Sequence, residues 1–227
     1  MILSLKKRYW DLRRAILNGR ASVELSRLDM KFVPWSTSAI QPAALMSILN
    51  EIVINNRRSA VEFGCGISTL YMARVLSEQG GRLISFEDNI GWAAHVRSLL
   101  ARQGLSDSVT LVEAPLRQGR WALSDLHWYD EQIVESSLAG VEIDFALVDG
   151  PPAYEVGKGL ARYPAFPAIA GHLSERCAVM LDDIGRPGEQ QVLAHWRTLP
   201  EFDLRVEVEV VTNIALCRRG SYFDSRY

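Results

Sequence analysis

From residue 59 onward, short apolar runs alternate with longer stretches whose apolar positions have helical spacing. The apolar runs predict strands at 59–63, 82–86, 109–112, 143–148 and 178–181. The stretches between them predict helices at about 67–79, 90–103, 129–138, 160–172 and 189–199. This alternation is typical of a parallel sheet with helices packed on its faces.

The last part of the chain has a different pattern. Residues 203–211 alternate strictly between polar and apolar positions, as a half-exposed strand does. A second short strand follows at 213–217 after a turn, so the two predict an antiparallel hairpin. We therefore expect an α/β fold with a mostly parallel sheet of seven strands that ends in this hairpin.

The first part of the chain is predicted to form a helical extension over residues 1–57, followed by one domain over 58–227. Residues 1–20 have the pattern of a basic amphipathic helix that ends at Asn18-Gly19. Such a helix can contact a membrane surface. It can equally pack on the domain or on a second copy in a homodimer, and the pattern leaves these interpretations open.

A second helix is expected within this extension. It runs from about Ala39 to Asn55, with Ser38 or Thr37 as its N-cap. The apolar positions within it recur at helical spacing, which predicts one buried face.

Composition narrows the class of protein. A chain of 227 residues with a net charge of −2 has no overall electrostatic attraction to nucleic acid, so no nucleic-acid partner is expected. The three cysteines show no C-x-x-C spacing, which argues against a disulfide framework or a zinc site. No apolar run reaches the roughly 20 residues of a membrane-spanning helix. Charged residues interrupt the N-terminus, unlike a signal peptide, so we expect a reducing, cytoplasmic setting.

A glycine turn joins the first predicted strand to its helix. Gly64-Cys65-Gly66 follows the strand, and glycines let a backbone approach a ligand closely. The first turn of the next helix leaves N–H donors free to face that ligand. A dinucleotide-binding turn would have a third glycine where this chain has Thr69. The turn instead carries an acid before it, Glu62, and a serine after it, Ser68.

The run Glu62-x-Gly64-x-Gly66-x-Ser68 resembles motif I of the class I SAM-dependent methyltransferases, with Ser68 in place of the last glycine. This resemblance implies a Rossmann-like fold that binds S-adenosyl-L-methionine (SAM). It also implies cofactor contacts at Glu62, Gly64, Gly66 and Ser68. An acid at Glu62 suits a ligand that carries an ammonium and a sulfonium. The segment before the second helix often covers the cofactor in such folds, so residues 36–41 are either ligand contacts or a plain helix cap.

Acidic residues stand at the ends of five consecutive predicted strands, at the sheet edge where ligands of open α/β folds bind. Glu87 stands where the family places a carboxylate for the two ribose hydroxyls, and a carboxylate offers two acceptor oxygens to such a diol. Asp88 is the next candidate at this position. Glu113 and Ala114 correspond to the family's adenine-edge position, where a small residue leaves room for the ring.

A second group of acids follows the fourth and fifth strands: Asp149, Asp182 and Asp183. Asp149 is also a candidate cofactor contact. Three converging carboxylates repel one another unless something positive lies among them, and Mg²⁺ with its preference for oxygen ligands would serve. The arrangement resembles the metal-dependent O-methyltransferases of the catechol type. The alternative is that Asp182 caps the next segment and Asp183 is solvated.

The chain departs from the catechol-type pattern after Asp149. Pro152 stands where that family has a lysine, and the surrounding run looks closer to bacterial relatives of the sugar and small-molecule methyltransferases. This leaves the base open. Asp149 could accept the proton itself, or Lys158 in the following loop could replace the missing lysine.

We therefore expect a SAM-dependent methyltransferase that transfers a methyl group to a hydroxyl of a small molecule or sugar by in-line displacement, assisted by a divalent metal. One alternative is a metal-independent N- or O-methyltransferase. An NAD-binding oxidoreductase and a SAM-binding interaction module without activity are the other two.

Overall fold

The sheet of the computed structural model, which describes residues 2–227 and their side chains from Arg8 onward, has seven strands in the order β3-β2-β1-β6-β7-β9-β8. The strands are β1 (Ser59–Phe63), β2 (Arg82–Glu87), β3 (Val109–Glu113), β6 (Ile143–Val148), β7 (Leu173–Asp182), β8 (Arg205–Glu209) and β9 (Ile214–Arg219). The first five pair in parallel, whereas β9 runs antiparallel to both β7 and β8. The predicted mostly parallel sheet with a C-terminal antiparallel hairpin is confirmed.

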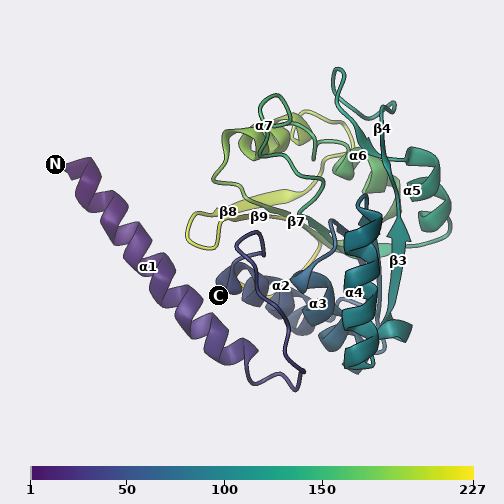
Figure 1. Cartoon of the computed structure of the whole chain (residues 1–227). Helices are drawn as coiled ribbons and strands as arrows, with labels where there is room; N and C mark the ends of the chain where they lie inside the picture. Colours follow the sequence, from purple (N-terminus) through teal and green to yellow (C-terminus); the bar gives the residue numbers. More distant parts are fainter. Residues whose placement is uncertain (1) are drawn as a thin grey trace.

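Helices cover both faces of this sheet (Figure 1). On one face lie α2 (Pro42–Ile54), α3 (Ile67–Glu78) and α4 (Ile90–Gln103). On the other lie α5 (Glu131–Leu138), α6 (Ala165–Ile169) and α7 (Pro187–Trp196). Successive strand residues point to opposite faces. Ala60 accordingly packs in the core under α2 and α3, and Val61 packs in the core under α5 to α7.

Two helix boundaries in the extension differ from the sequence prediction. Helix α1 (Ile2–Leu25) continues past Asn18-Gly19 instead of ending there. The side chain of Asn18 accepts a hydrogen bond from the backbone N–H of Ala43 at 3.0 Å, so it caps the neighbouring helix. Helix α2 begins at Pro42 rather than Ala39, because proline is well placed at the first helical position, where no N–H is needed.

Two helices predicted for the second half of the chain are shorter than expected. Trp128–Tyr129 is a short strand, β5, which pairs with β4 (Leu116–Arg117), and α5 begins only after Asp130. The side chain of Asp130 accepts hydrogen bonds from the first N–H groups of α5, which explains the start. The predicted helix 160–172 is helical over Ala165–Ile169 and then becomes a 3-10 turn. Short 3-10 turns of this kind occur at Ser106–Ser108 and Ala170–His172.

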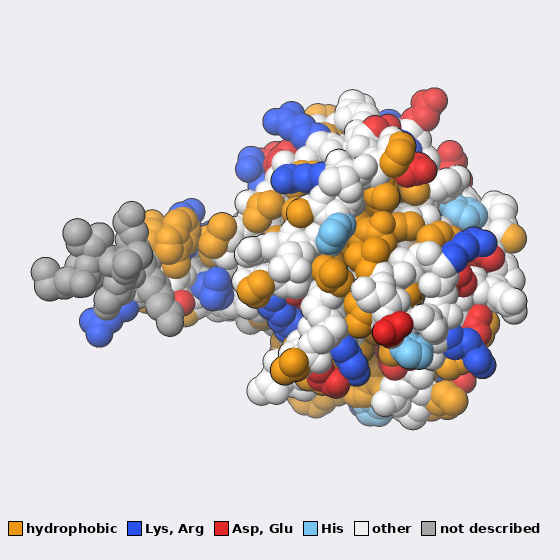
Figure 2. All heavy atoms as spheres, turned by 90° about the horizontal axis from the view of Figure 1, so that it is seen from above, with side chains coloured by type: hydrophobic (Ala, Val, Ile, Leu, Met, Phe, Trp, Pro, Cys, Tyr) orange, Lys and Arg blue, Asp and Glu red, His pale blue; other side chains and the backbone are white. Residues whose placement is uncertain are grey.

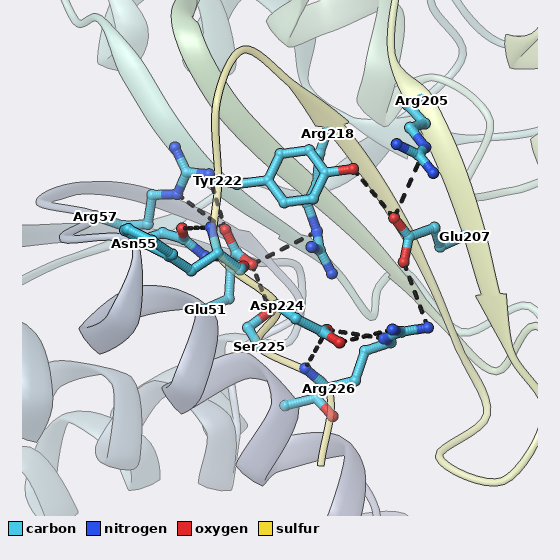
Figure 3. Close-up of polar contacts among 12 residues, drawn as sticks. Glu51, Asn55, Arg57, Arg205, Glu207, Arg218, Tyr222, Asp224, Ser225 and Arg226 are labelled. Atoms are coloured by element: carbon cyan, nitrogen blue, oxygen red, sulfur yellow. Dashed lines mark hydrogen bonds and ion pairs between the residues drawn. The ribbon is translucent and has the colours of Figure 1, made fainter.

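Helix α1 packs on α2 through its C-terminal half, where Ala21 and Leu25 are buried. Its N-terminal half extends away from the domain (Figures 1 and 2). Tyr9, Leu12 and Ile16 of this half are exposed. Within residues 2–227, no helix is both long enough and apolar enough to cross a bilayer. Contact of residues 1–20 with a membrane or a second copy, and the domain boundary at residue 58, stay predictions. Residue 1 lies outside the described part.

Candidate cofactor and acceptor site

A cavity of about 910 Å³ lies at the carboxyl ends of the parallel strands. The parts of the chain that line it include the glycine turn after β1, residues 87–89 at the end of β2, Asp149 with its neighbours after β6, and residues before α2 between Val33 and Ile40. The sequence predicted that the first three of these parts lie at one edge of the sheet, because parallel strands end on the same side. Residues 36–40 line the cavity as well, so the segment before α2 forms one of its walls.

Gly64 allows the glycine turn to pack against the neighbouring strand end. Its φ is +94°, in the region that favours glycine, and a Cβ there would lie 2.9 Å from the Cα of Gly150. The turn is also tied to the sheet, since Gly64 N–H donates to the carbonyl of Phe86 at 2.9 Å. Gly66 differs. A Cβ there would meet no heavy atom of the described chain within 4 Å, so this residue is open toward the cavity it lines.

Glu62 is placed beneath the turn and does not line the cavity. Its fully buried carboxylate accepts hydrogen bonds from the hydroxyls of Ser68 (2.5 Å), Thr69 (2.6 Å) and Ser85 (2.6 Å). Burial raises the pKa of Glu62 to about 7, although these hydroxyl hydrogen bonds favour the charged form. The carboxylate therefore links β1, β2 and the first turn of α3 by hydrogen bonds. It acts on the expected ligand by holding the first turn of α3, and not by direct contact.

Glu87 lines the cavity with its carboxylate held from both sides. One oxygen accepts from Cys65 N–H at 3.1 Å and the other from Asn89 N–H at 2.9 Å. Asp88 lines the same wall. Burial raises the pKa of Glu87, and the two backbone hydrogen bonds oppose this by favouring the anion. The structure thus places both predicted ribose candidates at the cavity, with Glu87 the more firmly oriented.

Glu113 and Ala114 do not line the cavity. Glu113 pairs with Arg97 at 2.9 Å on the surface, and Ala114 is fully buried. The cavity wall beyond Glu87 is formed by residues of α4 instead: Trp92, His95, Val96 and Leu99. No role was predicted for these four residues from the sequence, although their helical spacing shortly after Glu87 is a signal that they share one face.

The three predicted acids of the second group come together. One carboxylate oxygen from each of Asp149, Asp182 and Asp183 lies within 4.8 Å of the others. Burial raises the pKa of Asp149 to about 6, while nearby Arg162 lowers it. Burial also raises the pKa of Asp182 well above its usual range, and the neighbouring carboxylates add to this effect. Carboxyl groups with such raised pKa values are costly to hold as anions without a cation nearby.

That cation is Arg162, a residue to which the sequence analysis assigned no role. Its buried guanidinium donates from Nη2 to Asp149 Oδ1 at 3.1 Å, and Nη1 lies 3.3 Å from Asp183 Oδ2. Arg186 contacts the same Asp183 oxygen, with its Nη1 at 2.7 Å, and is more exposed than Arg162. Lys158, in contrast, does not line the cavity. It is half-exposed and pairs with Glu155 at 2.7 Å.

A family model described as a methyltransferase domain matches residues 61–184, more than half of the chain. The chain belongs to this family. It is a SAM-dependent methyltransferase of the class I fold. The matched segment includes the glycine turn, Glu87 and all three acids of the second group.

Solved methyltransferase structures share the fold at low identity. An O-methyltransferase from Bacillus cereus in complex with SAH is 15% identical, with a TM-score of 0.57, and the match covers 90% of both chains. TomG, an O-methyltransferase from Streptomyces achromogenes in complex with SAM, is 15% identical, with a TM-score of 0.56 and 90% of both chains covered. A SAH-bound methyltransferase from Podospora anserina is 13% identical, with a TM-score of 0.57, covering 97% of this chain and 96% of that one.

Proposed function

We propose that this methyltransferase transfers the methyl group of SAM to a hydroxyl of a small molecule, sugars included. The observation that supports this is a single cavity that joins the glycine turn and Glu87 to Asp149 and Asp183. Ligand pockets span about 300–1,000 Å³, so the cavity of about 910 Å³ has room for a cofactor together with a small acceptor. The O-methyltransferases of the same fold support oxygen as the target.

In this proposal SAM lies against the glycine turn. Gly66 lets the backbone approach the methionine part of the cofactor, Gly64 holds the turn against Gly150, and Glu87 accepts hydrogen bonds from the ribose hydroxyls. Its two backbone donors orient the carboxylate in advance, which lowers the entropy lost on binding. Asp88 flanks this position. The face of α4 that includes His95 and Leu99 takes the adenine side, in place of Glu113 and Ala114.

Glu62 and Ser68 have a supporting role in this proposal. The carboxylate of Glu62 holds the hydroxyls of Ser68 and Thr69, so the start of α3 stays in the position where its free N–H groups face the cavity. The hydroxyl of Thr69 also accepts from Gly66 N–H at 2.8 Å. Glu62 therefore acts on SAM by holding the turn rather than by contact.

Transfer itself requires alignment of the acceptor oxygen, the methyl group and the sulfur, because the sulfonium is already a good leaving group. Residues 36–40 cover the cavity and help to exclude water from that line. Asp149 takes the hydroxyl proton as the bond to carbon forms. Its pKa of about 6 keeps it ionised at neutral pH yet still basic enough to accept a proton. Lys158 as the base stays a prediction, which would require its loop to turn toward the cavity.

The residue types of the acidic group suit a divalent ion, but the arrangement of their side chains does not. Asp149, Asp182 and Asp183 offer the hard oxygen donors that Mg²⁺ prefers. However, the guanidinium of Arg162 already bridges Asp149 and Asp183, the carboxylates that a shared ion would have to bridge. The residues as arranged do not fit such an ion, so the proposed reaction includes no metal step.

The proposal is tested in two stages. Calorimetry with S-adenosylhomocysteine first measures cofactor binding without any acceptor. Methyl-labelled SAM is then incubated with alcohols, phenols and sugars, each beside its amine analogue, and labelled products are identified by mass spectrometry. Label on hydroxyl compounds supports the proposal. Label on the amines alone would overturn the choice of oxygen, and no binding of S-adenosylhomocysteine would overturn the cofactor site.

A further inference from the structure

Four carboxylates and two guanidiniums meet where β6 and β7 end. Arg162 lies at the centre, within 4 Å of Asp149, Asp183 and Glu189, at 3.1, 3.3 and 3.7 Å. Arg186 contacts Asp183 and Glu189 from the more exposed side, and Asp182 completes the set. The group holds four acidic side chains and two basic ones. Its most buried cation is the guanidinium of Arg162, a side chain of the protein rather than a bound ion.

Three backbone carbonyls hold Arg162 in this position. Its guanidinium donates to the carbonyls of Asp149 at 2.6 Å, Pro151 at 3.3 Å and Asp182 at 3.4 Å. These carbonyls belong to the ends of two adjacent strands and the turn after one of them, so the sheet itself determines where the charge lies. An arginine stays protonated at any pH at which the protein is folded, and its planar fork matches two carboxylates at once. The cation is therefore a permanent part of the strand ends.

We propose that Arg162 serves as the built-in cation of this acidic group in place of a divalent metal, and that its guanidinium is what excludes the metal. An ion bound by Asp149 and Asp183 would lie next to two N–H groups that point at the same oxygens. Like charges at such short range repel strongly in a buried site. The metal-binding part of this inference is independent of the acceptor; the statement that methyl transfer proceeds without metal rests on the proposed function.

The inference predicts that a metal site appears when the guanidinium is removed. Arg162→Gln leaves the acids in place and frees the oxygens of Asp149 and Asp183 for an ion. Calorimetric titration with Mg²⁺ and with Mn²⁺ should give no saturable heat for the wild type and saturable binding for Arg162→Gln. Arg162→Lys keeps a positive charge and should bind neither ion. Arg97→Gln, which removes a surface guanidinium paired with Glu113, is the control and should behave like the wild type.

A double variant locates any new site. Asp182→Asn added to Arg162→Gln should weaken the gained binding, because one of the oxygen ligands loses its charge. Binding in Arg162→Gln that the second change leaves intact would place the ion elsewhere and overturn the assignment. A folded Arg162→Gln protein that binds neither ion would show that the guanidinium is not what excludes the metal.

The wild-type protein tests the inference even if Arg162→Gln does not fold by circular dichroism. Chelator treatment should leave S-adenosylhomocysteine affinity and methyl transfer unchanged, and Mg²⁺ should produce no saturable heat. Saturable Mg²⁺ binding that Asp183→Asn abolishes, or loss of transfer on chelation, would overturn it. If the protein binds cofactor but methylates no hydroxyl, the proposed function fails, while the metal titrations still decide this inference.

Discussion

Gly64 and Gly150 meet backbone to backbone, so that a Cβ atom on Gly64 would lie 2.9 Å from the Cα of Gly150. The contact joins the turn after β1 to the turn after β6, and these two turns hold the proposed cofactor and acceptor groups. Neither glycine can be understood from its own turn alone. Their contact sets the separation of the two halves of the site.

This contact predicts that Gly64→Ala is destabilising. The new methyl group would meet backbone that cannot move aside, at a φ of +94° that costs a non-glycine residue about 1–3 kcal/mol. Urea unfolding should show a loss of stability of at least this size. Gly66→Ala is the matched change, because its Cβ meets no described atom within 4 Å. It should keep the stability of the wild type and lose affinity for S-adenosylhomocysteine. A loss of stability in Gly66→Ala together with unchanged affinity for S-adenosylhomocysteine would contradict the proposed position of SAM.

Glu87 should contribute to cofactor binding and Glu113 should not. Hydrogen bonds to a charged group contribute about 1.5–3 kcal/mol, so Glu87→Ala should weaken S-adenosylhomocysteine binding roughly 10- to 150-fold by calorimetry. Glu113→Ala should leave the affinity unchanged, since Glu113 lies outside the cavity and pairs with Arg97. Equal losses in both variants would restore Glu113 to the adenine edge, and no loss in either would remove Glu87 from the ribose site.

Glu62 should make the free protein less stable as the pH rises. Its pKa is about 7 when folded against 4.5 for an ordinary glutamate, so between these values the folded state keeps a proton that the unfolded state has lost. The related stability is complete below pH 4.5 and is lost as the pH rises through 7, by roughly 3 kcal/mol at most. Asp149 acts in the same direction, with its pKa raised to about 6.

Urea unfolding between pH 4.5 and 8 measures this effect. Glu62→Gln cannot ionise and should show a smaller fall in stability across the range, with the remaining fall due to Asp149. Glu113→Gln, a change at the surface, should keep the wild-type slope. A Glu62→Gln protein with an unchanged slope would show that Glu62 is ionised in the fold throughout this range.

Asp149→Asn should strongly slow transfer while leaving cofactor binding intact. Loss of a general base costs about 10²- to 10⁴-fold in rate, which is measured as kcat with saturating SAM and acceptor. In the wild type, kcat/KM should rise with pH through about 6 as Asp149 ionises. Lys158→Ala is measured in parallel and should retain activity, because Lys158 pairs with Glu155 away from the cavity. A loss of activity in Lys158→Ala but not in Asp149→Asn would assign the role of the base to Lys158 instead.

Much of the fold follows from the local pattern of apolar and polar residues along the chain. Apolar runs alternate with helical periods, which determines the parallel sheet, and the strict alternation after residue 203 determines the final hairpin. The meeting of Asp149 with Asp182 and Asp183 also follows from the sequence, because parallel strands that neighbour one another end at the same edge. These features depend on spacing along the chain and on a rule of topology, and neither requires knowledge of which side chains touch.

What only the tertiary structure decided is the partner of each charged group. Glu62 and Glu87 both lie at the carboxyl ends of strands, yet packing places one beneath the turn and the other at the cavity. Arg162 lies in an irregular loop, and only the folded strand ends bring its guanidinium between Asp149 and Asp183. The energy of a charge depends on its distance to neighbours that are remote in sequence and on its burial, and both are properties of the complete fold.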